Sequence, residues 1–432
     1  MSSTTISITE GVISVNRISA GIDIHRDFAC VSILERRVAE DRYLDYRRFD
    51  TTSDQMRVLR TWLLENGVSV VGIESTGKYW YSVFNALEKH FRINVYNARH
   101  IKNLPGKKTD KSDSRWIAKV TMDETIKPSF IPDTQIRDAR MLSRYRKSLV
   151  QERTRVRQQV HGLLESAGIK ISKCVSDLFG VSGMNLLKLI VSGQSYNEFI
   201  LDKLVRRQIR GKVPQLILAL DGYIRPIQRT TLGLLLDSND SLTGKIREIE
   251  DNLKRHLLDA PEKQEIFERV CQLPGFSEIS SLILLSEIGF DLSIFPTVKH
   301  FSSWGGLSPG SQESAGKNKS GRIQTRQKYL RGLMIEVALV AIVRKDSYLR
   351  ARYFKLKSKI GANKAVVAIA HKLFQAVYRA VKEDKEYREL GADYVSLNQV
   401  AKDLNTLTRI KERLGKDAVM ALIDQISPDK TE

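Results

Sequence analysis

Cysteine is scarce in this sequence, since only Cys30, Cys174 and Cys271 occur among 432 residues. Three well-separated cysteines form neither a disulfide framework nor a cysteine-based zinc site. The seven histidines form no HxH or HxxxH pair, which argues against a histidine-zinc site. No uninterrupted apolar stretch approaches the roughly eighteen residues that a bilayer requires. Residues 1–20 lack the basic start and apolar run of a secretory signal, so we expect a cytoplasmic protein.

Positive charge is abundant by contrast. Lys and Arg number 70 against 50 Asp and Glu, which gives a formal net charge of +20 that no single tail holds. This distribution favours nucleic acid as the partner over an anionic membrane, because no stretch suits a bilayer. Apolar residues make up 42% of the chain, enough for packed cores, and the length predicts two or three domains.

The first hundred residues alternate strand and helix patterns. Helical apolar spacing covers residues 52–66, and a second helix is expected over residues 78–90. Five strands are expected, over residues 19–24, 27–35, 43–50, 68–75 and 93–97. Three early strands followed by alternation with helices predict a mixed sheet covered by helices, which is an α/β domain.

The middle of the chain is basic and helical. Leu142, Leu149, Val156 and Leu163 recur every seven residues within a helix expected over residues 135–165. A second amphipathic stretch carries apolar residues on one side, namely Leu242, Ile246, Ile249, Leu253 and Leu257. Heptad spacing fits a coiled-coil pair, and ordinary bundle helices packing inside one chain fit it equally well.

Two features stand out towards the C-terminus. Residues 273–276, Leu-Pro-Gly-Phe before an apolar helix, resemble a helix-hairpin-helix turn whose amides approach a phosphate, although a plain Pro-Gly helix start fits as well. Residues 301–327 are rich in Gly, Ser and basic residues, which predicts a loop. Helices are expected at about 328–345 and 364–383.

Four carboxylates are candidate metal ligands. Asp23 lies inside the first predicted strand among apolar neighbours, where burial is costly unless a cation compensates. Glu74 ends a later strand, and Asp110 and Asp113 share one face of an expected helix start. Together they suit Mg²⁺ and phosphodiester chemistry. The alternatives are that Glu74 caps the next helix and that Asp110 or Asp113 is an N-cap.

The basic loop offers hydroxyl groups beside cations. Its serines are Ser308, Ser311, Ser314 and Ser320, and its cations are Lys317, Lys319, Arg322, Arg326 and, just beyond it, Arg331. A serine becomes a nucleophile only when its proton is removed and the developing charge is stabilised, which guanidinium groups can support. Composition does not choose among the serines, and it favours a phosphate-binding loop without chemistry.

The motifs resemble those of one family. GIDIHRDF, GIESTGKYW, NARHIKNLPGKKTDKSD, LPGF and WGGLSPGSQESAGKNKSG occur in the order typical of insertion-sequence-one-ten transposases, which are recombinases guided by a bridge RNA. The resemblance spans roughly residues 19–385 and is closest to the SPGxxESAGKxKSG subgroup. It implies an RNase H-like domain over 1–128, related to Holliday-junction resolvases, and a coiled-coil dimerisation region over 129–265. A mainly helical transposase domain over 266–390 and a helical tail of unknown role over 391–432 complete the division.

The resemblance also implies residue roles. Its DEDD carboxylate set falls on Asp23, Glu74, Asp110 and Asp113, and its nucleophilic serine, which follows Glu in the ESxG segment, falls on Ser314. Ser314 would form a covalent phosphoserine link to DNA, assisted by Mg²⁺. The expected nucleic-acid contacts are Lys317, Lys319, Arg322 and Arg326. His25 and Arg26 stand where many relatives have a small residue and Lys, so neither is assigned a role.

The family further implies its partners, which are double-stranded donor and target DNA, a guide RNA, and homodimers that assemble into a homotetramer. One alternative is a metal-dependent junction nuclease in which the serine only binds phosphate. Another is a DNA- and RNA-binding scaffold with inactive sites, which a retained four-acid cluster argues against because idle carboxylates repel one another.

Overall fold

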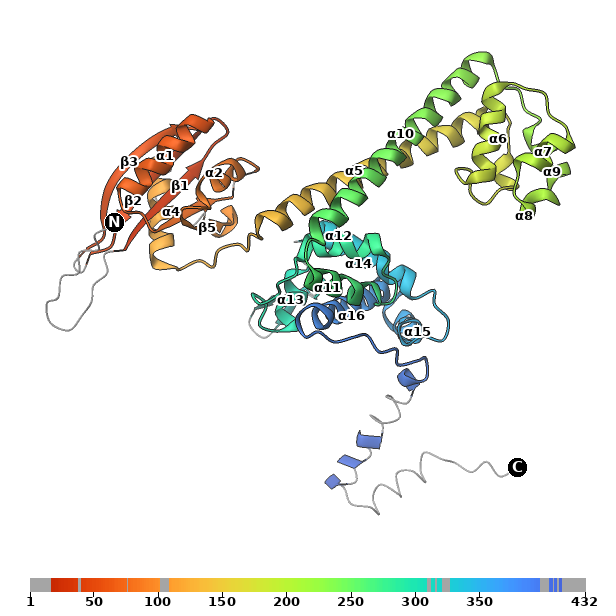
Figure 1. The fold of residues 1–432 in the computed structure, drawn as a ribbon. Helices are drawn as coiled ribbons and strands as arrows, with labels where there is room; N and C mark the ends of the chain where they lie inside the picture. Colours follow the sequence, from red (N-terminus) through yellow and green to blue (C-terminus); the bar gives the residue numbers. More distant parts are fainter. Residues whose placement is uncertain are drawn as a thin grey trace. The chain divides into compact units, whose positions relative to one another are not determined.

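The structure is a computed structural model, and it divides into two compact units, 1–132 and 133–432. It describes residues 17–37, 40–75, 77–101, 109–308, 312–314, 317–320, 327–396, 404–406, 408–409 and 412–413. Each unit is considered by itself below (Figure 1).

The first unit is built on a mixed five-stranded sheet with the order β3-β2-β1-β4-β5. Its strands are β1 (Ile18–Ile24), β2 (Phe28–Glu35), β3 (Arg42–Asp50), β4 (Val70–Glu74) and β5 (Arg92–Tyr96). β2 runs antiparallel to both β1 and β3, whereas β4 pairs in parallel with both β1 and β5. The predicted mixed α/β domain is therefore confirmed, with all five strands within two residues of their expected limits.

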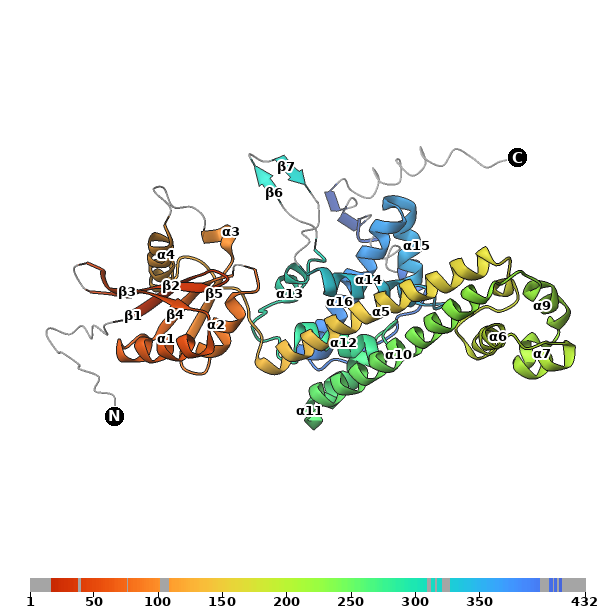
Figure 2. The ribbon, with the colours of Figure 1, turned by 90° about the horizontal axis from the view of Figure 1, so that it is seen from above.

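Helices cover both faces of this sheet (Figure 2). α1 (Ser53–Glu65) and α2 (Trp80–Leu87) pack on one face, where their apolar side chains join the even-numbered residues of β1 in the core. α4 (Asp110–Asp123) covers the opposite face, and the short α3 (Ala98–Ile101) precedes it.

Small residues let α4 lie close to the sheet. A Cβ atom on Gly21 would overlap the backbone of Ser114 and Ala118, and one on Gly72 would overlap the side chain of Thr121. The hydroxyl groups of Ser32 and Ser114 are 2.8 Å apart across the same interface. Ser19 of β1 donates to the Ala118 carbonyl (3.0 Å), and Gly21, further along β1, lies against Ser114, which is earlier in α4. The helix α4 therefore runs antiparallel to β1. The first turn of α4 therefore lies at the carboxyl end of β1.

The second unit is helical and is organised around two long antiparallel helices, α5 (Thr134–Ser166) and α10 (Pro226–Leu257). Figures 1 and 2 both show them side by side. Gln135 donates to the His256 carbonyl at one end (2.7 Å), and Gln228 donates to the Ser166 hydroxyl at the other (3.1 Å). The predicted heptad residues lie partly in this seam, where Leu149 packs with Leu242, Ile246 and Ile249. The two amphipathic stretches thus pack on each other within one chain.

Each end of the long pair carries a small helical core. One contains a short 3₁₀ turn (Ile171–Lys173), α6 (Val181–Ser192), α7 (Glu198–Leu204), α8 (Arg207–Arg210) and α9 (Val213–Leu220). The other contains α11 (Pro261–Cys271), α12 (Glu278–Ile288), α13 (Val298–Trp304), α14 (Lys328–Ala341), α15 (Tyr348–Ile360) and α16 (Ala362–Lys382). The prediction of a largely helical remainder is confirmed.

The C-terminal core differs in detail from the sequence prediction. The segment expected as a loop over 301–327 begins inside α13 and contains a two-stranded hairpin, β6 (Gln312–Ser314) with β7 (Lys317–Ser320). Gly275 of the Leu-Pro-Gly-Phe turn has a φ of +83°, and a Cβ atom there would overlap the Val337 carbonyl of α14. The close approach of α14 therefore explains why a glycine occupies position 275.

Arginine side chains of α5 fix the C-terminal core to the long helices. Glu287 of α12 is 2% exposed, and its carboxylate accepts two hydrogen bonds from Arg144 (2.9 and 3.0 Å). Arg140 pairs with the same carboxylate.

Within the part of the chain that is described, no helix is long and apolar enough to cross a membrane. Cys30, Cys174 and Cys271 are all unpaired.

Candidate active site

Two of the predicted carboxylates end neighbouring parallel strands. Ile22 of β1 pairs with Ile73 of β4, so Asp23 and Glu74 follow side by side at the carboxyl end of the sheet. Side chains alternate along a strand, which places Asp23 on the same face as Gly21, and Glu74 on the same face as Gly72. This is the face that α4 covers. Asp23 is 8% exposed.

The other two carboxylates lie in the first turn of α4. Thr109 is the N-cap, and its side chain accepts from the Ser112 amide (3.1 Å) while Ser112 reciprocates (2.9 Å). The alternative that Asp110 or Asp113 is the N-cap is therefore wrong. With the cap supplied by Thr109, both aspartates are left for other partners, at the positive end of the helix dipole.

The four carboxylates converge on Asp23. The pKa of Asp23 is raised to about 6, chiefly by burial; His25 lowers this pKa, and the charges of Glu74, Asp113 and Asp110 raise it. Residues separated by almost ninety positions in the sequence thus act on one carboxyl group. The structure brings together all four residues that the sequence singled out, at the end of β1 beneath α4.

His25 belongs to the same cluster, although the sequence reasoning gave it no role. Its Nε2 atom lies 3.3 Å from Asp23 Oδ2 and 3.5 Å from Asp110 Oδ1, and its ring stacks on Phe28 with centroids 4.5 Å apart. The available signal was its position two residues after Asp23, because the period of a strand puts such residues on one face. From the sequence, the histidines were considered as zinc-site pairs, and His25 was set aside as a departure from the family motif.

The cluster fits a divalent cation. Asp23, His25 and Asp110 each offer a ligand atom, and these atoms all lie within 4.8 Å of one another. Ligands about 2.1 Å from an ion are separated by about 3.0 Å at right angles and by about 3.4 Å in a tetrahedron. The nitrogen–oxygen distances at His25, 3.3 and 3.5 Å, are close to the tetrahedral value. A carboxylate-rich set containing one imidazole suits Mg²⁺ or Mn²⁺.

Cations and aromatic rings border the carboxylates. The guanidinium group of Arg48 lies 3.6 Å from the centroid of Phe28, and Lys111 of α4 lies 5.2 Å from that of Tyr46. Tyr46 donates to the thiol of Cys30 (3.3 Å), which is opposite Asp23 in the β1–β2 pairing. Burial raises the pKa of this thiol, so Cys30 stays protonated beside the acids. The positive rim is suited to phosphate.

The predicted nucleophile lies in the hairpin of the second unit. Ser314 ends β6 and pairs with Lys317 at the start of β7, which also contains Lys319. The side chains of these three residues lie outside the described part of the structure, as do Arg322 and Arg326 entirely. The functional roles of this hairpin remain predictions.

Comparisons with known proteins match both units. Residues 20–169 match a family described as a transposase, the DEDD transposase of IS110, and residues 267–354 match the transposase IS116/IS110/IS902 family. The transposase for insertion sequence element IS1111A of Coxiella burnetii (strain RSA 493 / Nine Mile phase I) is 20% identical over 331 residues, 74% of this chain and 80% of that protein. A crystal structure of Fowlpox virus resolvase with substrate Holliday junction DNA is 16% identical and covers 25% of this chain and 74% of its own. Its TM-score of 0.18 is too low to carry an argument.

Proposed function

We propose that the chain is an IS110-type transposase, an RNA-guided recombinase that cuts and rejoins DNA through a phosphoserine link, because residues 20–169 and 267–354 match transposase families. The observation that carries the proposal is the convergence of Asp23, Glu74, Asp110 and Asp113 at one end of the sheet. An isolated cluster of this kind repels itself, so its presence favours a bound cation and a reaction that uses it.

The metal-binding part of the site comprises the four carboxylates together with His25. Asp23 and Glu74 are fixed by the register of two parallel strands, and Asp110 and Asp113 by the capped first turn of α4. A divalent cation bound there would stabilise negative charge on phosphate oxygens. Arg48 and Lys111 lie beside the acids and are placed to contact the DNA backbone. We propose Mg²⁺ as the ion, because oxygen ligands predominate.

Ser314 is the proposed nucleophile. Its hydroxyl oxygen bonds to phosphorus as a deoxyribose oxygen leaves and takes up the serine proton. Attack by the hydroxyl of another strand then breaks the serine–phosphorus bond and returns a proton to the serine. Because one ester replaces another, no external energy source is needed. Lys317, Lys319, Arg322 and Arg326 would hold the non-bridging oxygens, where guanidinium groups bind bidentately. The hairpin β6–β7, whose second strand contains both lysines and whose first strand ends at Ser314, supports this proposal.

Partners follow from charge and from the resemblance. The net charge of +20 is spread along the chain, which suits two nucleic acids, donor or target DNA and a guide RNA that supplies specificity through base pairing. We propose that the protein acts as homodimers that form a homotetramer, with the carboxylates of one subunit serving Ser314 of another. The turn at Leu273–Phe276 between α11 and α12 is a proposed phosphate contact.

Two variants of the full-length protein test the chemistry. Ser314→Ala should abolish strand cleavage and joining while leaving DNA affinity near that of the wild type, and Ser320→Ala from the same hairpin is the control that should retain activity. Asp23→Asn should abolish cleavage at unchanged affinity. Metal-dependent cleavage that persists in Ser314→Ala would replace the phosphoserine mechanism with hydrolysis by a junction nuclease.

A further inference from the structure

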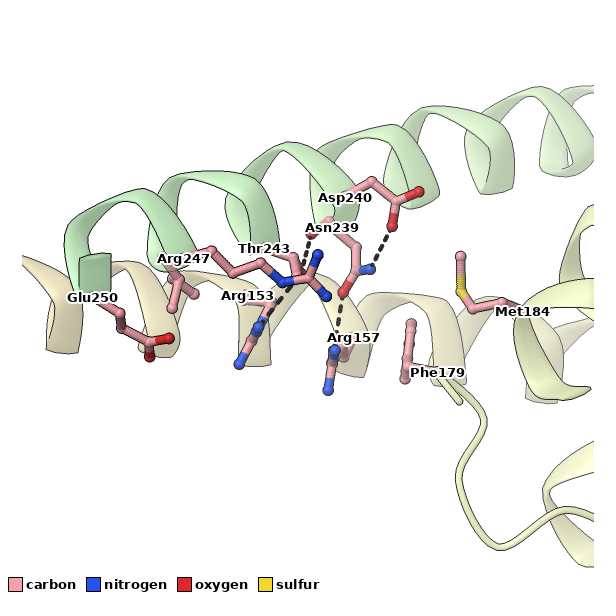
Figure 3. Close-up of a pocket in the computed structure, with 10 residues that line it drawn as sticks. Arg153, Arg157, Phe179, Met184, Asn239, Asp240, Thr243, Arg247 and Glu250 are labelled. Atoms are coloured by element: carbon pink, nitrogen blue, oxygen red, sulfur yellow. Dashed lines mark hydrogen bonds between the residues drawn. The ribbon is translucent and has the colours of Figure 1, made fainter. Parts of the chain in front are cut away.

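A basic pocket lies in the groove between α5 and α10, close to α6 (Figure 3). Its volume is about 450 Å³, which is in the range of ligand sites. We call it the arginine pocket, and its defining side chains are Arg153, Arg157, Asn239, Thr243, Arg247 and Phe179. None of these residues was singled out by the sequence motifs or belongs to the carboxylate cluster.

Helix geometry gathers the arginines. Arg153 and Arg157 lie one turn apart on α5, and Arg247 reaches the same groove from α10, as Figure 3 shows. Neutral groups orient two of them, since Arg157 donates to Oδ1 of the buried Asn239 (2.9 Å) and Arg153 donates to Thr243 (3.4 Å). These contacts hold the guanidinium groups in place without neutralising their charge.

The arginines of the pocket outnumber its two carboxylates, Asp240 and Glu250, by three to two. Glu250 pairs at 2.6 Å with Arg146, which does not line the pocket. Among the described residues, no carboxylate lies within ion-pair distance of Arg153 or Arg157. Burial and the nearby guanidinium groups of Arg157, Arg146 and Arg247 lower the pKa of Arg153, and Glu250 offsets part of this effect. Like charges held this close in the free protein are relieved by a bound anion.

We propose that the arginine pocket binds the sugar-phosphate backbone of a nucleic-acid strand. Guanidinium groups match phosphate oxygens bidentately, and two of them one turn apart can share a phosphate or hold two in succession. The ring of Phe179, which lies 4.6 Å from the guanidinium carbon of Arg157, and Met184 form an apolar wall at one end. That wall suits a sugar or a base, and the pocket is larger than a lone phosphate needs.

This site is additional to the proposed chemistry. It rests on the proposed function only for the class of partner, because it uses no carboxylate and no residue of the β6–β7 hairpin. The partner can be the DNA or the guide RNA, since both present the same phosphodiester. A carboxylate of a second copy of the protein is the competing occupant. Such a carboxylate would pair with the arginines and would not need to stack on Phe179.

The test measures the salt dependence of binding with full-length protein. Labelled duplex DNA and labelled single-stranded RNA are each titrated at several salt concentrations, with wild type and the double variant Arg153→Ala/Arg157→Ala. Two lost phosphate contacts should reduce the slope of log affinity against log salt by about 1.8 for a duplex or about 1.4 for a single strand. The polymer whose slope changes is the one that occupies the pocket.

Arg155→Ala is the matched control, because Arg155 is exposed on the same helix and carries the same charge. It should leave both slopes unchanged. Arg153→Lys keeps the charge but not the bidentate geometry, so it should preserve the slope and weaken the affinity several-fold.

Thermal unfolding of the same variants separates binding from a structural role. Removing Arg153 relieves repulsion between guanidinium groups. The thermal unfolding midpoint of the double variant without nucleic acid should therefore stay level with that of the wild type or rise. The inference would be overturned if the double variant had the same salt-dependence slopes as the wild type for both polymers. This holds even if the double variant unfolds at a lower temperature or no longer self-associates. Strand cleavage is a separate readout: a wild type that binds through the pocket but never cleaves would refute the proposed function alone.

Discussion

Asp23 lowers the stability of the free protein at neutral pH. It is 8% exposed, and it lies among three other carboxylates on β4 and α4. Its pKa rises from 3.8 to about 6 on folding, so the folded state prefers the protonated form. Ionisation therefore opposes folding above about pH 6, and below about pH 4 the effect vanishes because both states are protonated.

Replacing Asp23 should stabilise the unit that it serves. At about pH 8 without divalent ions, Asp23→Asn should raise the free energy of unfolding of the first unit by up to about 3 kcal/mol, which corresponds to a pKa shift of about two units. Near pH 4 the gain should disappear. Amide hydrogen exchange of β1 and β4 measures it locally. Asp27→Asn, an exposed neighbour, is the control, and an equal gain from both variants would contradict the account.

The sequence predicted some of these residues and not others. A carboxylate inside an apolar strand needs compensation, which identified Asp23, and the other three acids followed from element ends. His25 was missed because its partners, Asp23 and Asp110, meet only in the folded unit. The cap of α4 was open in the sequence, since Thr109, Asp110 and Asp113 all carry capping side chains. Only the backbone geometry chose Thr109.

At the scale of elements, the position of α4 depends on the glycines beneath it. Gly21 on β1 and Gly72 on β4 leave room for the helix backbone and for Thr121. A helix raised from the sheet would carry Asp110 and Asp113 away from Asp23. Close packing of one helix on two strands is therefore part of the site.

Gly21→Ala tests this packing. The added methyl group meets the backbone of Ser114 and Ala118, so the variant should lose about 1–3 kcal/mol of local stability and most of its cleavage activity. Hydrogen exchange of β1 and a cleavage assay measure the two effects. Gly162→Ala, a helical glycine with open space around it, is the control and should gain up to about 1 kcal/mol. Normal activity in Gly21→Ala would contradict the proposed role of the packing.

Strands were predictable because period-two patterns and all-apolar runs are strong local signals. α15 was missed because basic residues interrupt its apolar spacing, giving YLRARYFKLKSKI, and it buries only Tyr348 and Leu349. The heptads left two arrangements open, since an apolar stripe does not name its partner. The apolar residues of the partner helix α10 lie more than ninety positions further along the chain and meet Leu149 only in the folded unit.

In the whole molecule, the two units have different proposed tasks. The first carries the carboxylate cluster, and the second carries Ser314, the long helical pair and the arginine pocket. The division into domains at 128, 265 and 390 and the assembly into dimers and tetramers stay predictions. We propose that the acidic site of one unit and the basic hairpin of the other act on the same DNA phosphate.

The most direct measurement is the mass of the Ser314 peptide after reaction with a suicide DNA substrate. Full-length protein is incubated with the substrate, guide RNA and Mg²⁺, then digested and analysed by mass spectrometry. The account predicts a nucleotide adduct on Ser314 that disappears when Mg²⁺ is chelated or when Asp23 is replaced by Asn. Complete cleavage of the DNA with an unmodified Ser314 peptide, or an adduct on another residue, would contradict it.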